Sequence, residues 1–525
     1  MKNLLLVFII LLALALRIPG IFWGNIDKPT HDFWEPDELQ HAEIATKQMH
    51  TLDTTLYADR DFSRIWNLRA FGNQVGVLTF VAYQLDLLEL KRNKIILIGR
   101  FLSTFYSILL ILLVFQLGKT IFQSEPIGLL AALFLAIFDL NITYSHYALP
   151  AISYIFWVHL SLLATFFFYK IIPKKRILFK QAYFYLLPFP FAMSLATKLD
   201  FIPLLVFFIA IALLIFQRKL SFQKSILATS IFLSLVAFYL IAIHGFHIDI
   251  AEAIRSSTVA KDLNTNVIPK DNHWLHNPVL YLAATICGSS LLIVILAVAS
   301  STRLVLEYRK KVLDDKAIYL ALFLTFLLLE FLIRWRMDTP FVRRANIFLP
   351  YCALLAAYGL QTLFKNALLQ KIVKLSVVLY TLGLAIVSQY NFWNDTRYQS
   401  RAFILEAFSG EEKINYSMYA RERRMPRQNA KTQVEANILV FHEAFYGRYR
   451  KMFTTPFKIP ECCKEVYHCN EQACKETQDL LHDKTNFKLL KSFETLEVFP
   501  ERVLFKRYFG TYETFLGDVL IYIHQ

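Results

Sequence analysis

Residues 95–117 read IILIGRFLSTFYSILLILLVFQL, and this stretch decides the fold class. It carries a single charge, Arg100, over a length that can cross the hydrocarbon core of a bilayer, which takes about 20 apolar residues. The sequence therefore predicts a polytopic α-helical membrane protein with about eleven transmembrane helices. The other apolar runs lie near residues 4–22, 127–145, 150–169, 182–197, 201–216, 223–243, 278–300, 317–333, 346–363 and 372–390.

The composition of the chain supports a membrane location. Of its 525 residues 56% are hydrophobic and only 18% are charged, and the 47 Phe and 26 Tyr suit helices that face lipid and its interfaces. The 56 basic and 41 acidic residues give a net charge of +15. Much of this excess lies in short loops between apolar runs, where it orients the chain in an anionic membrane. We therefore expect lipid partners and no nucleic acid.

The basic loops predict the orientation of the chain. Lys174-Lys175-Arg176, Arg218-Lys219 and Arg309-Lys310-Lys311 fall on one side if the N-terminus is cytoplasmic, as positive loops do. The run that begins at Leu4 is interpreted as a retained first helix because no small-residue cleavage site follows it. An odd number of spans then places the C-terminus outside the plasma (inner) membrane.

Two domains are expected. Residues 1–391 form the transmembrane module, with a long outer loop over 23–94 whose apolar part, 74–90, is suited to lie on the membrane surface. Residues 392–525 form an extracytoplasmic α/β domain, large enough to bury its own core. Within it we predict a helix over 396–407 and strands at 438–441 and 519–523.

Four of the six cysteines cluster in this second domain. On the outside of the membrane disulfides persist, so two disulfides are the main expectation, with a zinc site that includes His468 as the alternative. Cys287 and Cys352 lie in apolar runs and are expected to be packing residues. The disulfide candidates are Cys462, Cys463, Cys469 and Cys474.

The strongest chemical signal is Trp34-Glu35-Pro36-Asp37-Glu38-Leu39-Gln40-His41, in the first outer loop. A partly desolvated carboxylate there is suited to take a proton from an acceptor hydroxyl or amine. The alternative is a solvated loop in which Asp37 and Glu38 stabilise the N-terminal end of a helix. Glu38 and His41 share one face if that helix begins after Pro36.

Cations at outer or membrane-level positions complement these carboxylates. Lys198, next to Asp200, interrupts two apolar runs, where a charge is costly and commonly lines a polar cavity. The third outer loop is rich in arginine, which suits phosphate recognition, although contact with lipid headgroups is the alternative. His146 lies in a polar turn and is either functional or structural. The arginines are Arg334, Arg336, Arg343 and Arg344.

Several short motifs occur in a specific order along nearly the whole chain. They are Pro36-Asp37-Glu38 with His41, the segment 144–150 (YSHYALP), Ala196-Thr197-Lys198, Arg343 followed by Pro350, Asn394-Asp395-Thr396-Arg397 and Phe499-Pro500-Glu501-Arg502. This set resembles the GT-C membrane glycosyltransferases, in the bacterial branch similar to protein O-mannosyltransferases and lipid A aminoarabinose transferases. The sequence departs from the family pattern at Ala151, where an Asp commonly follows the Pro, and at Ile347, which replaces a Pro.

The resemblance implies a GT-C fold and a polyprenyl-phosphate-sugar-dependent glycosyltransferase. Such an enzyme transfers a sugar on the outer face to an acceptor, which is a protein, lipid A or another glycan. It implies Asp37 as the catalytic base, assisted by Glu38, and Lys198 and Arg343 as contacts of the carrier phosphate. The expected substrate-binding residues are His41, His146, Lys198, Arg336 and Arg343.

Two other functions and one cofactor question stay open at this point. Ala151 favours a non-catalytic relative that binds polyprenyl lipid as a scaffold, whereas Asp37 and Glu38 disfavour it. A transporter of lipid-linked sugars is disfavoured because the sequence shows neither an internal repeat nor a buried charged pathway. No tight ligand cluster identifies a metal site, so no cofactor is assigned and a divalent metal is left open.

Overall fold

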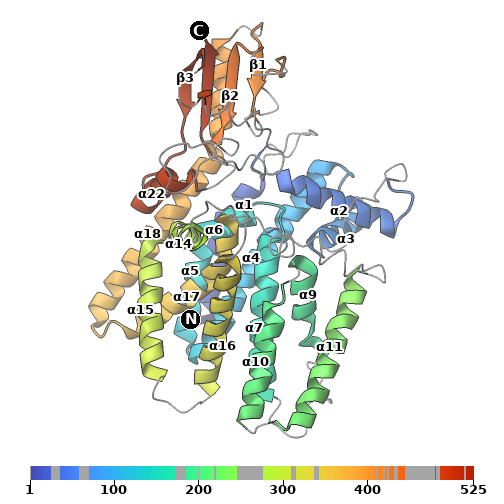
Figure 1. The fold of residues 1–525 in the computed structure, drawn as a ribbon, viewed down its shortest axis with the longest axis vertical. Coiled ribbons are helices and arrows are strands. Elements are labelled where there is room, and N and C mark those ends of the chain that lie inside the picture. Colours follow the sequence, from blue (N-terminus) through green and yellow to red (C-terminus); the bar gives the residue numbers. More distant parts are fainter. Residues whose placement is uncertain are drawn as a thin grey trace.

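The computed structural model shows a bundle of long helices with a small β-sheet at one end (Figure 1). Two shorter helices, α2 and α3, lie at the same end of the bundle as the sheet (Figure 1). The structure describes residues 2–24, 36–57, 70–171, 185–198, 200–217, 220–244, 276–308, 315–335, 342–408, 411–417, 420–421, 425–430, 435–443, 479–480, 485–512 and 516–525.

Each predicted apolar run coincides with a helix or a pair of helices over the residues described. The runs near 127–145 and 278–300 are each divided between two helices. The helices of the bundle are α1 (Lys2–Ile21), α4 (Arg92–Phe122), α5 (Glu125–Ile137), α6 (Asp139–Ser145), α7 (Ala151–Ile171), α9 (Phe189–Lys198), α10 (Ile202–Phe216), α11 (Phe222–His244), α14 (His276–Ser289), α15 (Leu291–Tyr308), α16 (Asp315–Trp335), the 3-10 helix η1 (Val342–Phe348), α17 (Leu349–Thr362) and α18 (Ala367–Trp393).

Six helices in the described ranges are long and apolar enough to cross a membrane, and up to eight are if each bent pair counts as one span. The bent pairs are α5 with α6, at 59°, and α14 with α15, at 113°. The chain is therefore an integral membrane protein by length and composition of its helices. The count of eleven spans and the membrane face of each end stay predictions, and the three basic clusters lie outside the described residues.

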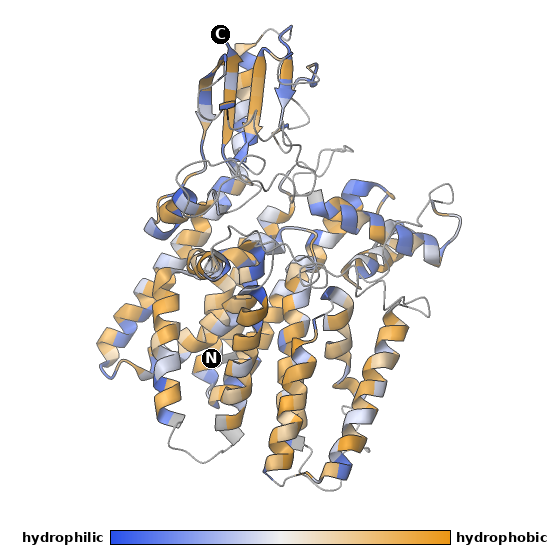
Figure 2. Ribbon diagram, viewed as in Figure 1, coloured by the Kyte–Doolittle hydropathy of each residue, from blue (hydrophilic) through white to orange (hydrophobic). Residues whose placement is uncertain are grey.

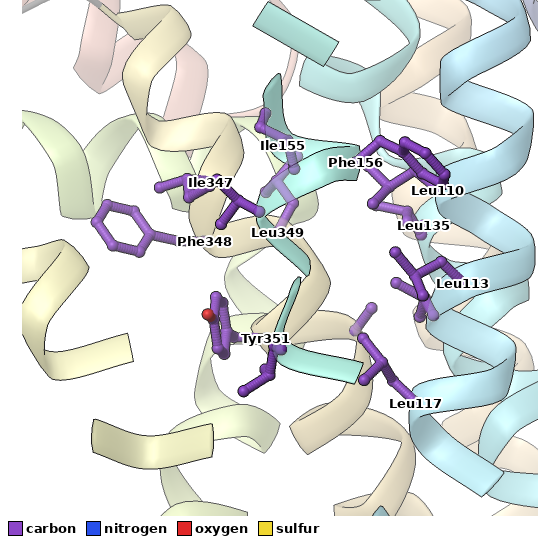
Figure 3. Packing of buried hydrophobic residues seen from close by; sticks show 14 of the residues in the cluster. Leu110, Leu113, Leu117, Leu135, Ile155, Phe156, Ile347, Phe348, Leu349 and Tyr351 are labelled. Atoms are coloured by element: carbon purple, nitrogen blue, oxygen red, sulfur yellow. The ribbon is translucent and has the colours of Figure 1, made fainter. Parts of the chain in front are cut away.

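Apolar side chains fill the bundle and also cover its outside. Leu113 of α4, Leu135 of α5 and Phe156 of α7 belong to the same buried apolar cluster as residues 347–351, at the junction of η1 and α17 (Figure 3). The long helices are hydrophobic over most of their length (Figure 2), and many of their large apolar side chains are exposed, with Phe216 of α10 at 78%. A helix bundle that is apolar on both its inner and outer faces is suited to lipid.

A buried arginine explains the break between α5 and α6. Arg17 of α1 donates from Nη1 to the carbonyl of Ala136 at 2.9 Å and from Nη2 to Asn141 Oδ1 at 2.8 Å. The last carbonyls of a helix have no partner within the helix, so a cation at that position stabilises the end of α5. Arg17 Nε also donates to Ser107 Oγ of α4 at 2.8 Å, so this side chain joins α1 to α4, α5 and α6.

The long segment between α1 and α4 contains a pair of helices, α2 (Pro36–Leu52) and α3 (Ala70–Gln84). Helix α2 begins at Pro36, as predicted, because proline needs no hydrogen-bond partner for its nitrogen in the first turn. Two glycines of α3 allow close packing: a Cβ at Gly76 would lie 2.6 Å from the carbonyl oxygen of Ala45, and one at Gly72 would lie 2.6 Å from Ile44 Cγ2. A helix is therefore present at the predicted segment 74–90, beginning and ending earlier than expected, and its place on the membrane surface stays a prediction.

The C-terminal part contains a four-stranded sheet of order β1-β2-β4-β3 (Figure 1). Strand β1 (Ile414–Tyr416) runs parallel to β2 (Ile438–His442), and the other neighbours are antiparallel, with Val440 of β2 opposite Ile521 of β4. The predicted strands are confirmed by β2 and β4 (Val519–His524), and the predicted helix by α19 (Thr396–Ala407). The remaining elements are β3 (Phe487–Phe493) and α22 (Pro500–Phe509).

Helix α22 connects the C-terminal part to the bundle through Arg502. This buried guanidinium forms an ion pair with Asp139 at the start of α6, donates to Ser388 Oγ of α18 at 2.7 Å and lies 4.9 Å from the ring centroid of Tyr512. Tyr380 of α18 also donates to the carboxylate of Glu501 at 2.7 Å. The motif Phe499-Pro500-Glu501-Arg502 therefore holds the two parts of the chain together.

A second connection forms around Trp23, directly after α1. The guanidinium of Arg100 lies 5.7 Å from its ring centroid and that of Arg397, in α19, lies 5.5 Å from it. The ring of Phe392 lies edge-on at 5.3 Å. Cations stack favourably on the face of an indole, so Trp23 links the first span, α4 and the start of the C-terminal part.

Candidate active site

Glu38 is fully buried and pairs with Arg100, which lies within the apolar run 95–117. Its two oxygens accept from Nε and Nη2 of Arg100, each at 2.7 Å, and Oε1 also accepts from the backbone N–H of Ala148 at 2.7 Å. Arg100 Nη1 donates to the carbonyls of Ile21 and Trp23, at 3.0 and 2.6 Å. This bidentate pair fixes the start of α2 against α4 and the segment that precedes α7.

Asp37, the neighbour of Glu38, faces a different partner. Arg343 of η1 donates from Nη1 to Asp37 Oδ2 at 2.7 Å, across 306 residues of sequence. The side chain of Asp37 is 46% exposed and that of Arg343 is 25% exposed. The structure thus brings together the predicted base and a predicted phosphate contact, at a position that a substrate can reach.

Lys198 belongs to the same charged region. Its ammonium lies 4.8 Å from the ring centroid of Tyr154 in α7, and the positive charges of Arg343, Arg344 and Arg334 act on it. Lys198 is exposed, and no carboxylate in the described ranges forms an ion pair with it. The charges that act on Lys198 are thus three arginines and the one carboxylate of Asp200, an excess of positive charge that attracts an anion.

The hydroxyl of Tyr154 is hydrogen-bonded to two further charged residues, Asp200 and Arg334. The phenol hydroxyl donates to Asp200 Oδ2 and accepts from Arg334 Nη2 at 3.0 Å. Arg334 in turn forms an ion pair with Glu330, one turn earlier in α16. The sequence drew attention to Asp200 and Arg334 but not to Tyr154 or Glu330, because a single Tyr or Glu within an apolar run has the pattern of an ordinary packing residue.

Two predicted substrate-binding histidines pack inside the protein. His41 of α2 is buried, with its ring edge-on to Phe71 of α3 at 5.7 Å. His146 is fully buried beside Phe392, at 5.0 Å between ring centroids, and a Cβ at Gly20 would collide with its ring. The ring of His146 therefore packs against α1 and α18.

Some predicted features fall on residues that the structure does not describe. These are Arg336 and the four clustered cysteines Cys462, Cys463, Cys469 and Cys474, so the substrate role of the first and the two disulfides stay predictions. Cys287 and Cys352 are free thiols, as expected. Within the described ranges no group of three or more His, Cys, Asp or Glu side chains is arranged to hold a metal ion.

Ala151 is the first residue of α7 and is buried. One turn later on the same helix is Tyr154, whose hydroxyl holds Asp200. The region thus contains a reachable carboxylate at Asp37, a second partly exposed carboxylate at Asp200 and the cations Lys198 and Arg343. Such a set can bind an anionic group and accept a proton next to it.

No protein-family model matches the chain, and no curated protein matches it in sequence. Among solved structures, the chain is similar to the oligosaccharyltransferase of Archaeoglobus fulgidus in complex with Zn and sulfate, at 13% identity and a TM-score of 0.47, over 84% of this chain and 68% of the other. A second structure of that enzyme, tethered with an acceptor peptide, gives 14% identity and a TM-score of 0.44, over 82% of this chain and 60% of the other.

ArnT from Cupriavidus metallidurans, bound to undecaprenyl phosphate, is similar at 13% identity and a TM-score of 0.44, over 86% of this chain and 96% of the other. Both proteins are GT-C glycosyltransferases, the group that the sequence motifs resemble.

Proposed function

We propose that this protein is a membrane glycosyltransferase that moves a sugar from a polyprenyl-phosphate donor to an acceptor at the extracytoplasmic face. The observation that carries the proposal is the contact of Asp37 with Arg343 beside Lys198. A base for the acceptor and a cation for the leaving phosphate must lie close together, and the hydrogen bond between Asp37 and Arg343 supports this pairing of roles.

In the proposed reaction an acceptor hydroxyl or amine attacks the anomeric carbon of the donor sugar. Its proton passes to the Asp37 carboxylate as the new bond forms, and the bond between the anomeric carbon and the phosphate oxygen breaks. The polyprenyl phosphate leaves with the negative charge, which Arg343 and Lys198 stabilise. Glu38 takes a positioning role, because Arg100 and the N–H of Ala148 already occupy its carboxylate.

The acceptor is a protein, lipid A or another glycan, and its class is open. The described residues supply no cluster of metal ligands, and addition or removal of divalent cations from the reconstituted protein tests whether the reaction needs one. The transmembrane module is proposed to span residues 1–391 and the extracytoplasmic domain 392–525.

Reconstitution into vesicles with polyprenyl-phosphate sugars tests the function. We expect Asp37→Asn to lower the transfer rate by about 10²- to 10⁴-fold, the usual contribution of a positioned general base. The matched control is Glu43→Gln, an exposed carboxylate two turns later on α2, which should retain full activity. Transfer at the normal rate by Asp37→Asn would refute Asp37 as the base, and lipid binding by wild type without any transfer would favour the scaffold function.

A further inference from the structure

The network around Tyr154 contains polar groups that the proposed transfer step does not use. Glu330 is fully buried and Arg334 nearly so, and Tyr154 is buried beside them. Glu330 Oε1 and Arg334 Nε have no hydrogen-bond partner in the part of the chain that the structure describes. Ionisable groups at this depth in a membrane protein are costly, and they are commonly retained where they line a polar site.

Asp200 is the member of this network that a ligand can reach. It is partly exposed, whereas the residues behind it are buried. Its Oδ1 accepts from the backbone N–H of Ile202 at 2.9 Å, at the start of α10, and its Oδ2 accepts from Tyr154. Each carboxylate oxygen can accept more than one hydrogen bond, so Asp200 retains acceptor capacity while its orientation is fixed.

The position of Asp200 in the chain limits what it can bind. It follows Lys198 by two residues, and both side chains contact Tyr154, one through the ring face and one through the hydroxyl. A phosphate held by Lys198 and Arg343 would therefore place the group attached to that phosphate close to Asp200. In the donor proposed above this group is the sugar, whose hydroxyls are donors that match a carboxylate.

We propose that Asp200, oriented by Tyr154 and Arg334, binds hydroxyl groups of the donor sugar and so distinguishes a sugar-loaded carrier from the bare polyprenyl phosphate. The inference rests on the proposed function, because it takes Lys198 and Arg343 as the phosphate contacts. Tyr154 is a positioning residue in this assignment, since it acts through Asp200 and Lys198 and not through the reacting atoms.

The test compares binding of two lipids to the full-length protein in nanodiscs. One lipid is bare polyprenyl phosphate, and the other is the same lipid carrying the sugar that wild type binds most tightly from a panel of common hexoses and pentoses. We expect Asp200→Asn to weaken binding of the sugar-loaded lipid by about 10- to 100-fold, the usual effect of a hydrogen bond to a charged group. Its binding of the bare lipid should change by less than about 3-fold, because the phosphate contacts remain.

Tyr154→Phe provides a second variant, since it removes only the hydroxyl that orients Asp200. We expect a smaller loss of the same kind, about 3- to 10-fold and confined to the sugar-loaded lipid. The control for loss of a tyrosine hydroxyl is Tyr239→Phe, whose hydroxyl donates to the carbonyl of Tyr185 at 2.8 Å. Asn also caps helices well, so Asp200→Asn should keep α10 intact, which a thermal melt verifies.

Three results would overturn the inference: equal losses for both lipids, no loss for either, or a wild type that binds every sugar-loaded lipid no better than the bare one. Failure of the proposed function gives a different pattern, in which wild type does not bind bare polyprenyl phosphate or Asp37→Asn transfers sugar normally. The two failures are therefore distinguishable in the same set of measurements.

Discussion

Asp37 and Glu38 are consecutive in the chain, yet they face different environments. The helix start at Pro36 turns Glu38 inward to Arg100 and leaves Asp37 half exposed beside Arg343. Glu38 pairs with the buried arginine and determines where its neighbour stands. Two carboxylates of equal chemistry thus differ in burial and in partner because one helical step rotates a side chain by about 100°.

Removal of one partner from the buried pair should destabilise the protein. We expect Glu38→Gln to lower the free energy of unfolding by about 3 to 5 kcal/mol, because Arg100 would be left buried without a counter-ion. Thermal unfolding in detergent measures the loss. Replacement of both residues by Met should be less damaging than Glu38→Gln alone, and an unchanged melting temperature in the single variant would contradict the structural role.

The residues of the site could be predicted only in part. Asp37, Lys198 and Arg343 carry charges at predicted outer or membrane-level positions, which made them visible in the sequence. Arg100 and Glu330 were not predicted as site residues because each is the single charge in an apolar run, and their ion pairs depend on the fold. His146 is a polar residue in a turn, and sequence alone does not show that its ring faces Phe392.

At the scale of elements, the α2–α3 pair shows how small residues determine geometry. Gly72 and Gly76 are four residues apart, so they lie on one face of α3 and let α2 approach closely. The opposite face exposes Val77, Leu78 and Val81, which is the apolar surface that the sequence predicted to rest on the membrane. The predicted range extended past the end of α3 at Gln84, and Asp86, two residues later, has a left-handed backbone conformation.

A larger side chain at Gly76 should separate these helices. We expect Gly76→Val to destabilise the protein by about 1 to 3 kcal/mol through overpacking against Ala45 and Gln48, and to reduce sugar transfer because α2 carries Asp37. Thermal unfolding and the vesicle assay measure the two effects. Leu78→Val, on the exposed face of α3, is the matched control, and equal behaviour of the two variants would argue against the close contact.

At the scale of the molecule, the two parts of the chain are joined through Arg502. The helix pattern of the membrane part and the strand pattern of the C-terminal part were readable from sequence, since each follows its own hydrophobic period. The joint at Arg502 was not readable from sequence, because it forms only when Asp139 of α6 and Ser388 of α18 contact this arginine in the folded chain. Long-range pairs of this kind leave no periodic signal.

Loss of this arginine should loosen the C-terminal part. We expect Arg502→Met to leave Asp139 buried without its cation, to lower the melting temperature and to increase cleavage of the C-terminal part by added protease at least several-fold. Arg507→Met is the control, because Arg507 lies on the same helix, is exposed and lies over the ring of the adjacent Tyr508. Equal protease resistance of the two variants would show that the joint is held elsewhere.

The same joint should respond to pH through Glu497. Burial raises the pKa of this carboxyl to about 7, although Arg502 and Lys506 oppose the shift. The folded state therefore holds a proton that the unfolded state releases above about pH 4.5, so stability falls as pH rises toward 7, by up to about 3 kcal/mol. Glu497→Gln should flatten melting curves measured between pH 5 and pH 8, and an unchanged slope would exclude this carboxyl as the source.

The stacking of Trp23 between Arg100 and Arg397 has a consequence for biogenesis. During synthesis, Trp23 and the segment with Asp37 are made long before Arg397. Asp139 likewise lacks its ion-pair partner until Arg502 is made, near the end of synthesis. The early helices thus remain incompletely packed until the last part of the chain has been synthesised. A prematurely terminated chain would insert but would lack the contacts that close the joint, and quality-control proteases could recognise it by the uncovered indole and the unpaired carboxylate.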